Sequence, residues 1–252
     1  MALDHNQQNH IIYFASDFHL GVPSFKESIK REKKLVNWLS MAAKDATEIF
    51  LVGDLFDFWF EYKYTIPKGY TRFLGKVADI VDSGIPVYVF TGNHDMWMFD
   101  YLEKEIGITI IRKPKNFTFN SKTFHIAHGD GLGPGDHSYK LIKKMFSNKL
   151  CQWLFARIHP NLSFKIANYW SKKSRENENQ PTTFLEDKEW LVQYAKGLLK
   201  DQHYDFFIFG HRHLAVEHQI SAKSKYVNLG EWISSFTYAK FDGNTLELKK
   251  FN

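Results

Sequence analysis

The chain has 252 residues, of which 44% are hydrophobic and 17% aromatic, and this composition excludes an intrinsically disordered protein. A single cysteine, Cys151, excludes a disulfide framework and fits a reducing compartment. The most apolar runs, 49–52 and 206–209, are too short to cross a bilayer, and the polar start carries no secretory signal. We therefore expect a soluble, intracellular protein with one domain over residues 1–252.

The net charge of +5 is concentrated in one segment. Residues 137–175 contain nine lysines and arginines and no acidic residue, whereas the rest of the chain has 24 basic and 28 acidic residues. The protein outside this segment is therefore not basic, which disfavours nucleic acid as its partner. The basic segment needs an explanation of its own.

Apolar runs alternate with helical patterns over the first half of the chain. Strands are predicted at 11–15, 49–52 and 87–91, and helices at 26–43, 72–83 and 100–106. One or two further strands are expected between residues 108 and 128. Strands that alternate with helices in this way indicate an α/β fold with a buried, largely parallel sheet.

The chain beyond the basic segment predicts one more helix and a second sheet. A helix is expected at 183–199, where Thr183 and Glu186 fit a capping box. A buried strand follows at 206–209. The segments at 226–229, 234–241 and 245–251 alternate like antiparallel strands, with a turn at Asp242-Gly243.

Five of the apolar runs end in clusters of Gly, Asp, Asn or His. In chain order these clusters lie at 17–19, 53–57, 92–95, 128–130 and 210–213. Because ligand sites in open α/β sheets form at the carboxyl ends of strands, we expect the clusters to meet at one edge. Glycines at 53, 92 and 210 would let the backbone turn sharply, so that the next side chain points into the site.

Together the clusters supply seven oxygen and nitrogen donors and no thiolate: Asp17, His19, Asp54, Asn93, His128, His211 and His213. This set suits Mn²⁺, Fe²⁺, Zn²⁺ or Co²⁺ and is too large for one ion. Two ions about 3.5–4 Å apart, bridged by Asp54, would use all seven ligands and leave positions for water and substrate. Any one of these residues could be a surface histidine or a turn-forming aspartate. Their joint order and strand-end placement favour a metal site.

The ordered motifs D-x-H, G-D-x-x-D, G-N-H-D, H-G-D and G-H-x-H resemble those of the calcineurin-like metallophosphoesterases. The resemblance implies a β-sandwich flanked by helices and hydrolysis of phosphoesters by metal-activated water. It also implies how the ligands divide. One metal ion would be held by Asp17, His19, Asp54 and His213, and the other by Asp54, Asn93, His128 and His211.

Two further residues of these motifs are candidates for catalysis. Imidazole titrates nearest to neutral pH, so His94 is the candidate to stabilise the leaving oxygen or to donate a proton to it. The family's spacing implies that Asp57 orients His94. Alternatively, Asp57 could hold a metal-binding residue in place or cap a helix.

The basic segment predicts a pair of amphipathic helices at 141–158 and 162–175, interrupted at Pro160. It falls between the fourth and fifth motifs, so we expect it to fold over the site as a lid, at about 136–180. Three roles are open. The helices could cap the core with their apolar side, form a nucleic-acid groove, or accept an acyl chain while their cations meet anionic headgroups or phosphates.

The position of this insertion, the chain length and the string HGDGLGPGDHSY at 128–139 are similar to the UDP-2,3-diacylglucosamine hydrolases of lipid A biosynthesis. That resemblance implies cleavage of a UDP-glucosamine lipid to UMP and the lipid 1-phosphate, with two metal ions, Mn²⁺ first among them. It also implies a peripheral place on the inner face of the bacterial inner membrane. The substrate-binding residues would be Asn93, Asp136, Tyr139, Ser174 and Arg175.

One position departs from the better-known branch of those enzymes, which has Arg where this chain has His94. General phosphoesterases also have His there. A soluble phosphodiesterase or nucleotidase of the same fold is therefore the alternative enzyme. A non-catalytic scaffold is disfavoured because the set of predicted ligands is complete.

Overall fold

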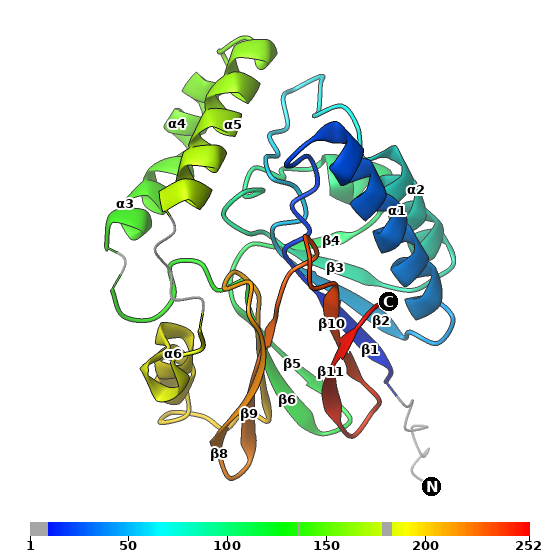
Figure 1. The fold of residues 1–252 in the computed structure, drawn as a ribbon, viewed down its shortest axis with the longest axis vertical. Helices are drawn as coiled ribbons and strands as arrows, with labels where there is room; N and C mark the ends of the chain where they lie inside the picture. The colour runs from blue at the N-terminus through cyan, green and yellow to red at the C-terminus, as the bar shows by residue number, and fades with distance from the viewer. Residues whose placement is uncertain (1–9, 136, 178–182) are drawn as a thin grey trace, which may run out of the picture.

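Two mixed β-sheets pack face to face in the computed structural model, which describes residues 10–135, 137–177 and 183–252 (Figure 1). The first sheet has the strand order β11 (Leu246–Lys250), β10 (Thr237–Phe241), β1 (Ile12–Ala15), β2 (Glu48–Val52), β3 (Val87–Phe90) and β4 (Thr109–Ile111). The second has the order β5 (Lys115–Phe119), β6 (Lys122–Ile126), β7 (Phe206–Phe209), β9 (Ser224–Leu229) and β8 (Ala215–Ser221). The structure thus confirms an α/β fold built as a sandwich.

Aromatic side chains fill the space between the two sheets. Phe14 of β1 lies 5.2 Å from Phe50 within its own sheet and 6.1 Å from Phe124 in the facing sheet, measured between ring centroids. All three side chains are fully buried. Burial of such large apolar rings is the main stabilising contribution available to a sandwich core.

Helices cover the outer faces of the sandwich. The helices α1 (Phe25–Ala42) and α2 (Thr71–Asp82) lie on the first sheet, and α6 (Trp190–Leu198) lies on the second (Figure 1). A short π-helical turn, Leu102–Ile106, precedes β4. The neighbouring strands β1, β2, β3 and β4 are parallel, so their carboxyl ends all point to one end of the molecule.

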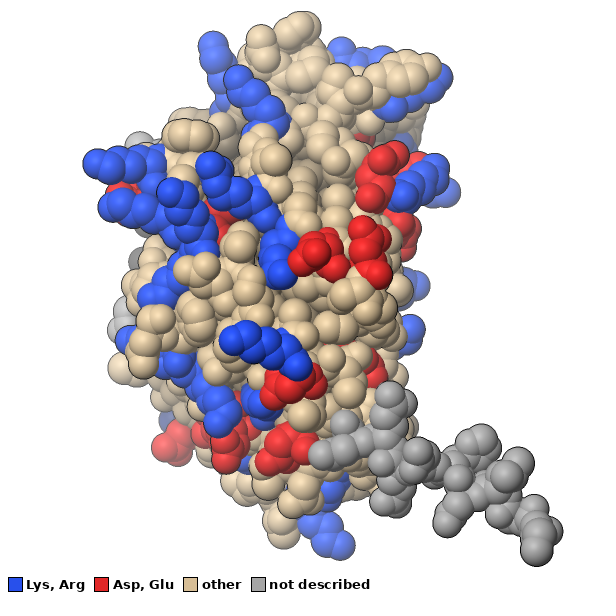
Figure 2. Space-filling view, turned by 90° about the vertical axis from the view of Figure 1, so that its right-hand side faces the viewer, with Lys and Arg blue, Asp and Glu red and all other residues tan. Residues whose placement is uncertain are grey.

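The surface that α1 and α2 present to solvent carries both charges (Figure 2). Lys30 of α1 pairs with Glu27 at 2.9 Å, and Lys76 of α2 pairs with Asp79 at 2.7 Å. Both pairs join residues three positions apart on one helix, and surface ion pairs of this kind contribute little to stability.

The predicted helix at 183–199 is wrong in its first half. A 3₁₀ turn occupies Glu186–Lys188, and α6 begins only at Trp190. Neither element has a side-chain cap, so the expected capping box is absent from this described part of the chain. The buried carboxylate of Glu189 instead pairs with Arg212 at 2.8 Å, and this contact holds the backbone extended where the helix was expected.

The second sheet also differs from the prediction. Of the three segments predicted to form it, the two C-terminal ones are β10 and β11, which extend the first sheet in antiparallel fashion. The third is β9, which does belong to the second sheet. The edge strand β8 was not predicted. Its side chains alternate between exposed and half-buried, so no apolar run marks it in the sequence.

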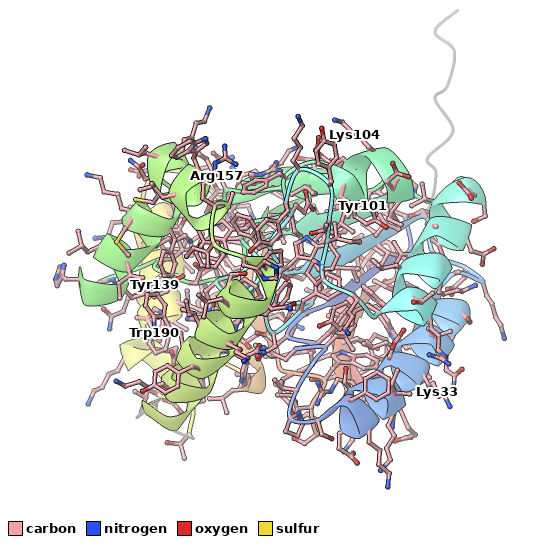
Figure 3. All side chains as sticks on the ribbon, turned by 90° about the horizontal axis from the view of Figure 1, so that it is seen from above. Lys33, Tyr101, Lys104, Tyr139, Arg157 and Trp190 are labelled. Carbon is pink, nitrogen blue, oxygen red and sulfur yellow. The ribbon has the colours of Figure 1, made fainter. Side chains whose placement is uncertain are left out.

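The basic segment forms three helices instead of two: α3 (His137–Phe146), α4 (Lys149–Phe155) and α5 (Pro160–Asn177). The side chain of Asn148 accepts hydrogen bonds from the backbone N–H groups of Leu150 and Cys151, so a new helix begins there. We refer to residues 137–177 as the helical insertion. It stands beside the sandwich at the carboxyl ends of the strands, opposite Lys33 of α1 (Figures 1 and 3).

One side of the helical insertion packs on the body. Phe146, Phe155 and Phe164 join a cluster with Phe58 and Trp97 of the loops beyond β2 and β3. Other large apolar side chains of the insertion are exposed: Leu141, Ile142, Met145, Leu150, Trp153, Leu154, Leu162, Tyr169 and Trp170. Among the residues described, no helix is long and apolar enough to span a bilayer.

Candidate metal centre

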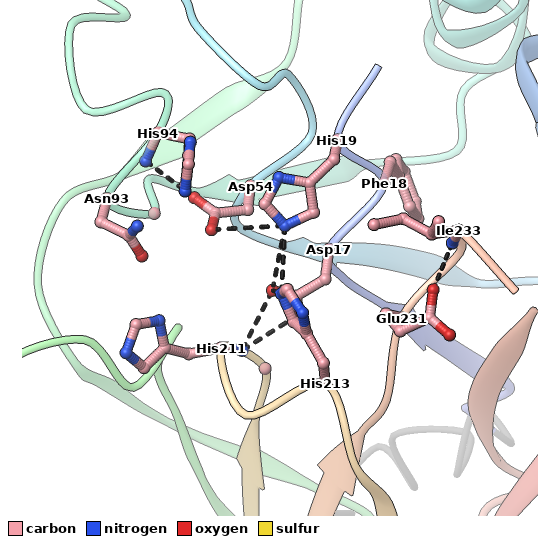
Figure 4. Close-up of polar contacts among 12 residues, drawn as sticks. Asp17, Phe18, His19, Asp54, Asn93, His94, His211, His213, Glu231 and Ile233 are labelled. Atoms are coloured by element: carbon pink, nitrogen blue, oxygen red, sulfur yellow. Dashed lines mark hydrogen bonds and ion pairs between the residues drawn. The ribbon is translucent and has the colours of Figure 1, made fainter. Parts of the chain in front are cut away.

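The seven predicted ligands meet at the carboxyl ends of five strands, and six of them are labelled in Figure 4. They come from both sheets rather than from one edge of one sheet. Asp17 and His19 follow β1, Asp54 follows β2, Asn93 follows β3, His128 follows β6, and His211 and His213 follow β7. The sandwich therefore brings together five loops that are distant in the sequence.

The first group of donors consists of Asp17, His19 and His213. The Nε2 atoms of the two histidines lie 3.1 Å apart, and Nε2 of His213 lies 3.2 Å from Oδ1 of Asp17. One donor atom from each residue lies within 4.8 Å of the others, close enough for a single cation.

The second group consists of Asp54, His128 and His211, with Asn93 beside it. Nε2 of His128 lies 3.3 Å from Oδ2 of Asp54 and 3.2 Å from Oδ1 of Asn93. The same Oδ2 atom of Asp54 lies 3.8 Å from Nε2 of His19. Asp54 thus stands between the two groups, where a bridging ligand is needed.

The donor chemistry of both groups fits divalent cations. Asp17, His19, Asp54 and His128 are buried, and burying carboxylates next to one another is costly unless positive charge compensates them. The Nε2 atoms of His19 and His213 face each other at 3.1 Å, an arrangement in which one cation can bind to both. Oxygen and imidazole donors without thiolate suit hard to borderline metals.

Backbone strain is concentrated at these residues. Positive φ angles occur at five of the seven: Asp17 (57°), His19 (43°), Asp54 (53°), His211 (66°) and His213 (55°). Non-glycine residues rarely adopt this left-handed region, and such strain persists where the surrounding structure enforces it. Strain shared by residues from three different loops indicates that their orientation serves function.

The motifs require glycine at positions 53, 92 and 210. Only at Gly53 is the reason the sharp turn that we expected, whereas Gly92 and Gly210 are required for lack of space. Gly53 does have a positive φ of 86°. A Cβ atom on Gly92 would lie 2.1 Å from Oδ1 of Asp54, and one on Gly210 would lie 2.5 Å from Oδ2 of Asp17. At Gly92 and Gly210, therefore, the carboxylates occupy the space that any side chain would need.

Backbone groups fix the orientation of the donors. Nδ1 of His128 donates to the carbonyl oxygen of Val52 at 2.8 Å, which leaves Nε2 to face the centre. The carboxylate of Asp95 accepts from the N–H groups of Gly92 and Leu55, both at 2.7 Å, and so ties two loops together. Nothing in the sequence predicts this role of Asp95, although it is the last residue of the G-N-H-D motif.

His94 lies at the edge of this centre, and its contact with Asp57 differs from the expected one. Nδ1 of His94 donates to the backbone carbonyl of Asp57 at 2.9 Å, whereas the Asp57 carboxylate is 3.9 Å away. Burial opposes a charge on this imidazole, but the carboxylates of Asp54 and Asp57 outweigh it and raise the pKa of His94. The carboxylate of Asp57 lies nearer to Nδ1 of His19, at 3.6 Å.

The predicted substrate residues of the helical insertion are only partly described. The hydroxyl of Tyr139 donates to Oδ2 of Asp130 at 2.5 Å, and Nζ of Lys143 lies 2.6 Å from the same atom. Asp136 and the side chains of Ser174 and Arg175 lie outside the described residues. A small cavity next to His128 is lined by Lys143 together with Arg112 and Lys113.

Comparison with known proteins agrees with this arrangement. The family model of the calcineurin-like phosphoesterases matches residues 10–215, which include all five loops. The chain belongs to the calcineurin-like phosphoesterase family. It is therefore a metal-dependent phosphoesterase with a buried His/Asp site consistent with two metal ions.

Two curated relatives of this phosphoesterase carry the same name. A protein of Porphyromonas gingivalis called UDP-2,3-diacylglucosamine hydrolase is 38% identical over 94% of this chain and 96% of its own length. One of the same name from Actinobacillus succinogenes is 25% identical over 88% of this chain and 92% of its own. A solved structure with 12% identity superposes with a TM-score of 0.51 over 97% of this chain and all of the other, which supports the fold.

The protonation states of the phosphoesterase site predict how its metal affinity depends on pH. Burial opposes protonation of His128, but the carboxylates of Asp54 and Asp17 raise its pKa to about 10. Burial and the neighbouring His128 lower the pKa of His211 to about 4. At neutral pH a cation must therefore displace a proton from His128 but none from His211. Metal affinity should rise about tenfold per pH unit between pH 6.5 and 8.

Calorimetry of Mn²⁺ binding in buffers of different ionisation enthalpy measures the protons released. The His128→Asn variant should release about one proton fewer than the wild-type protein. Equal proton release by the two proteins would contradict the assigned protonation of His128.

Proposed function

We propose that the protein cleaves the pyrophosphate bond of UDP-2,3-diacylglucosamine and releases UMP and the lipid 1-phosphate. The observation that carries this proposal is the combination of a two-cation phosphoesterase site with a basic helical insertion that exposes many apolar side chains. A substrate with two phosphates and two acyl chains matches both features. The name of the Porphyromonas gingivalis relative supports the same substrate.

In this proposal the seven residues bind two ions in two sets. Asp17, His19, Asp54 and His213 would hold one ion, and Asp54, Asn93, His128 and His211 the other. Two divalent cations lower the pKa of bound water and neutralise the charge that develops on the phosphoryl oxygens. We propose Mn²⁺ as the native metal, with Fe²⁺, Zn²⁺ and Co²⁺ as alternatives of similar ligand preference.

His94 and Asp57 would act on the leaving group. The Nδ1–H of His94 donates to a carbonyl oxygen, so the ring presents Nε2 to the substrate. The raised pKa of His94 favours the protonated form, which can donate to the leaving oxygen. The Asp57 carboxylate would stabilise the positive charge of His94. It would also help to orient His19, whose Nδ1 atom lies 3.6 Å from Oδ1 of Asp57.

The helical insertion would act as a lid and as the contact with the membrane. Its exposed apolar side chains, such as Trp153 and Leu150, would meet the acyl chains or the bilayer surface. Lysines and arginines of the same helices would attract anionic headgroups of the cytoplasmic leaflet. We therefore propose a peripheral location on the inner face of the bacterial inner membrane.

The diphosphate and the sugar would bind between this lid and the metal centre. Tyr139 lies on α3 and contacts Asp130, which directly follows the His128–Gly129 pair. We propose that Asn93, Asp136, Tyr139, Ser174 and Arg175 contact the substrate. The cavity next to His128 is lined by Arg112 and Lys113, whose cations can contact phosphate oxygens, and by Lys143, which pairs with Asp130.

Release of UMP from UDP-2,3-diacylglucosamine by the Mn²⁺-loaded protein tests the proposal directly. We expect the specificity constant for this lipid to exceed that for a generic aryl phosphodiester by orders of magnitude. Equal or better hydrolysis of the aryl phosphodiester would instead favour a soluble phosphodiesterase or nucleotidase. Absence of any phosphoester hydrolysis with Mn²⁺ bound would contradict the assigned reaction class.

The lid role predicts that a charge on its exposed apolar face weakens lipid binding. Trp153 is suited to the test because its side chain is exposed and outside the packed cluster, whereas Phe155 packs against Phe58 and Phe60. The Trp153→Glu variant should raise KM for the lipid about tenfold and leave hydrolysis of a small phosphodiester unchanged. The Leu185→Glu variant, changed at an exposed site outside the insertion, is the matched control. Equal effects of Trp153→Glu on both substrates would contradict the lid role.

A further inference from the structure

One side chain of the helical insertion reaches the catalytic groups directly. The hydroxyl of Ser171, on α5, donates to Oδ2 of Asp57 at 2.7 Å, and its oxygen lies 3.4 Å from Nδ1 of His94. Ser171 and Asp57 are both buried, so water competes little for these hydrogen bonds. A hydroxyl from the insertion is thus part of the network behind the metal centre.

The geometry gives this hydroxyl a defined orientation. A carboxylate can only accept, so the Ser171 proton points to Asp57 and the hydroxyl oxygen is left to accept from Nδ1–H of His94. That N–H is shared with the backbone carbonyl of Asp57 at 2.9 Å. The other carboxylate oxygen, Oδ1, lies 3.6 Å from Nδ1 of His19. Ser171 therefore touches the group that stands between His94 and His19.

The position of α5 against the body brings Ser171 to Asp57 and His94. Ser163, Ala167 and Ser171 are spaced four residues apart and so lie on one side of the helix. Ser163 is fully buried and hydrogen-bonded to Tyr62, while Ala167 packs against the aromatic cluster around Trp97. Small side chains along this side let the helix approach the body closely enough for a serine hydroxyl to reach Asp57.

We propose that Ser171 is a positioning residue that couples docking of the helical insertion to the geometry of Asp57 and His94. With α5 docked, the hydroxyl holds the Asp57 carboxylate in place, and the imidazole rings on either side of it keep their orientation. The inference rests on the proposed roles of Asp57 and His94 and adds a specific contact between lid and chemistry. The reacting groups would then be fully ordered only when the lid is in place.

The test compares Ser171→Ala with Ser163→Ala on a small alkyl phosphodiester, whose leaving oxygen needs a proton and which avoids any effect of acyl-chain binding. Both variants remove a buried serine hydroxyl from the same side of α5, so their melting temperatures should fall by similar amounts. Ser171→Ala should lower kcat about tenfold or more with KM nearly unchanged, because a hydrogen bond to a charged group is lost. Ser163→Ala should retain the wild-type kcat, and Ser171→Thr, which keeps the hydroxyl, should recover most of it.

Three results would overturn the inference. These are a kcat of Ser171→Ala within twofold of wild type, an equal loss of kcat in Ser163→Ala, and no recovery in Ser171→Thr. A wild-type protein that binds Mn²⁺ but hydrolyses no phosphodiester would instead refute the proposed function itself. The two failures are therefore distinguishable in one set of measurements.

Discussion

Replacement of His94 by alanine is expected to leave the two metal ions bound and to lower kcat by about 10²- to 10⁴-fold. The imidazole lies at the edge of the centre, held by the Asp57 carbonyl, and its raised pKa favours the protonated form, which has a proton to donate. Removing it takes away proton donation and charge stabilisation at the leaving oxygen. Metal content by mass spectrometry and steady-state kinetics on the same preparation measure both quantities.

The leaving group provides an internal control for this variant. A nitrophenolate leaves without a proton, so the loss in kcat should be much smaller for a nitrophenyl ester than for a substrate with a poor leaving group. One nitrogen of His94 also lies within 4.8 Å of donor atoms of His19 and Asp54. Loss of a metal ion from His94→Ala would therefore contradict the catalytic role and make His94 a ligand.

The second large effect is expected from a single methyl group at Gly92. A Cβ atom there would lie 2.1 Å from Oδ1 and 2.6 Å from the backbone nitrogen of Asp54, so the loop or the carboxylate must move. Because Asp54 stands between the two groups of donors, its displacement should lower the affinity of the site for both ions. We expect Gly92→Ala to lose at least one ion and to lower kcat about a hundredfold or more.

Gly75 offers the matched control for Gly92. It lies in α2, exposed, and a Cβ atom built there meets nothing within 4 Å. Gly75→Ala should keep full metal content and kcat and should stabilise the protein by about 1 kcal/mol through its higher helix propensity. A Gly92→Ala protein with two bound ions and wild-type kcat would show that the carboxylate position is not critical.

The metal centre could be predicted from the sequence because its signals are local. Each donor follows a short, largely buried strand, and a glycine or a neighbouring acidic residue marks the turn. Order and spacing of these clusters along the chain are sufficient to bring them together once the strands are parallel. The strained backbone at Asp17 and Asp54 could not be predicted, since positive φ at an aspartate has no marker in the sequence.

Features that depend on contacts distant in the sequence were predicted poorly. The helix expected from residue 183 begins only at Trp190, because Glu189 pairs with Arg212 and overrides the local capping pattern. The contact of Ser171 with Asp57 joins residues 114 positions apart. Nothing in the helical pattern of the basic segment distinguishes Ser171 from a serine that faces solvent. Such contacts follow from how α5 docks on the body, and docking is a property of the whole fold.

Crystallography of the Mn²⁺-loaded protein, with anomalous scattering measured at the manganese edge, tests the central claim most directly. The account predicts two anomalous peaks about 3.5–4 Å apart, with Asp54 between them and the six other donors divided as proposed. A single peak, or manganese bound elsewhere while His128 and His213 make no contact with it, would contradict a two-metal phosphoesterase site.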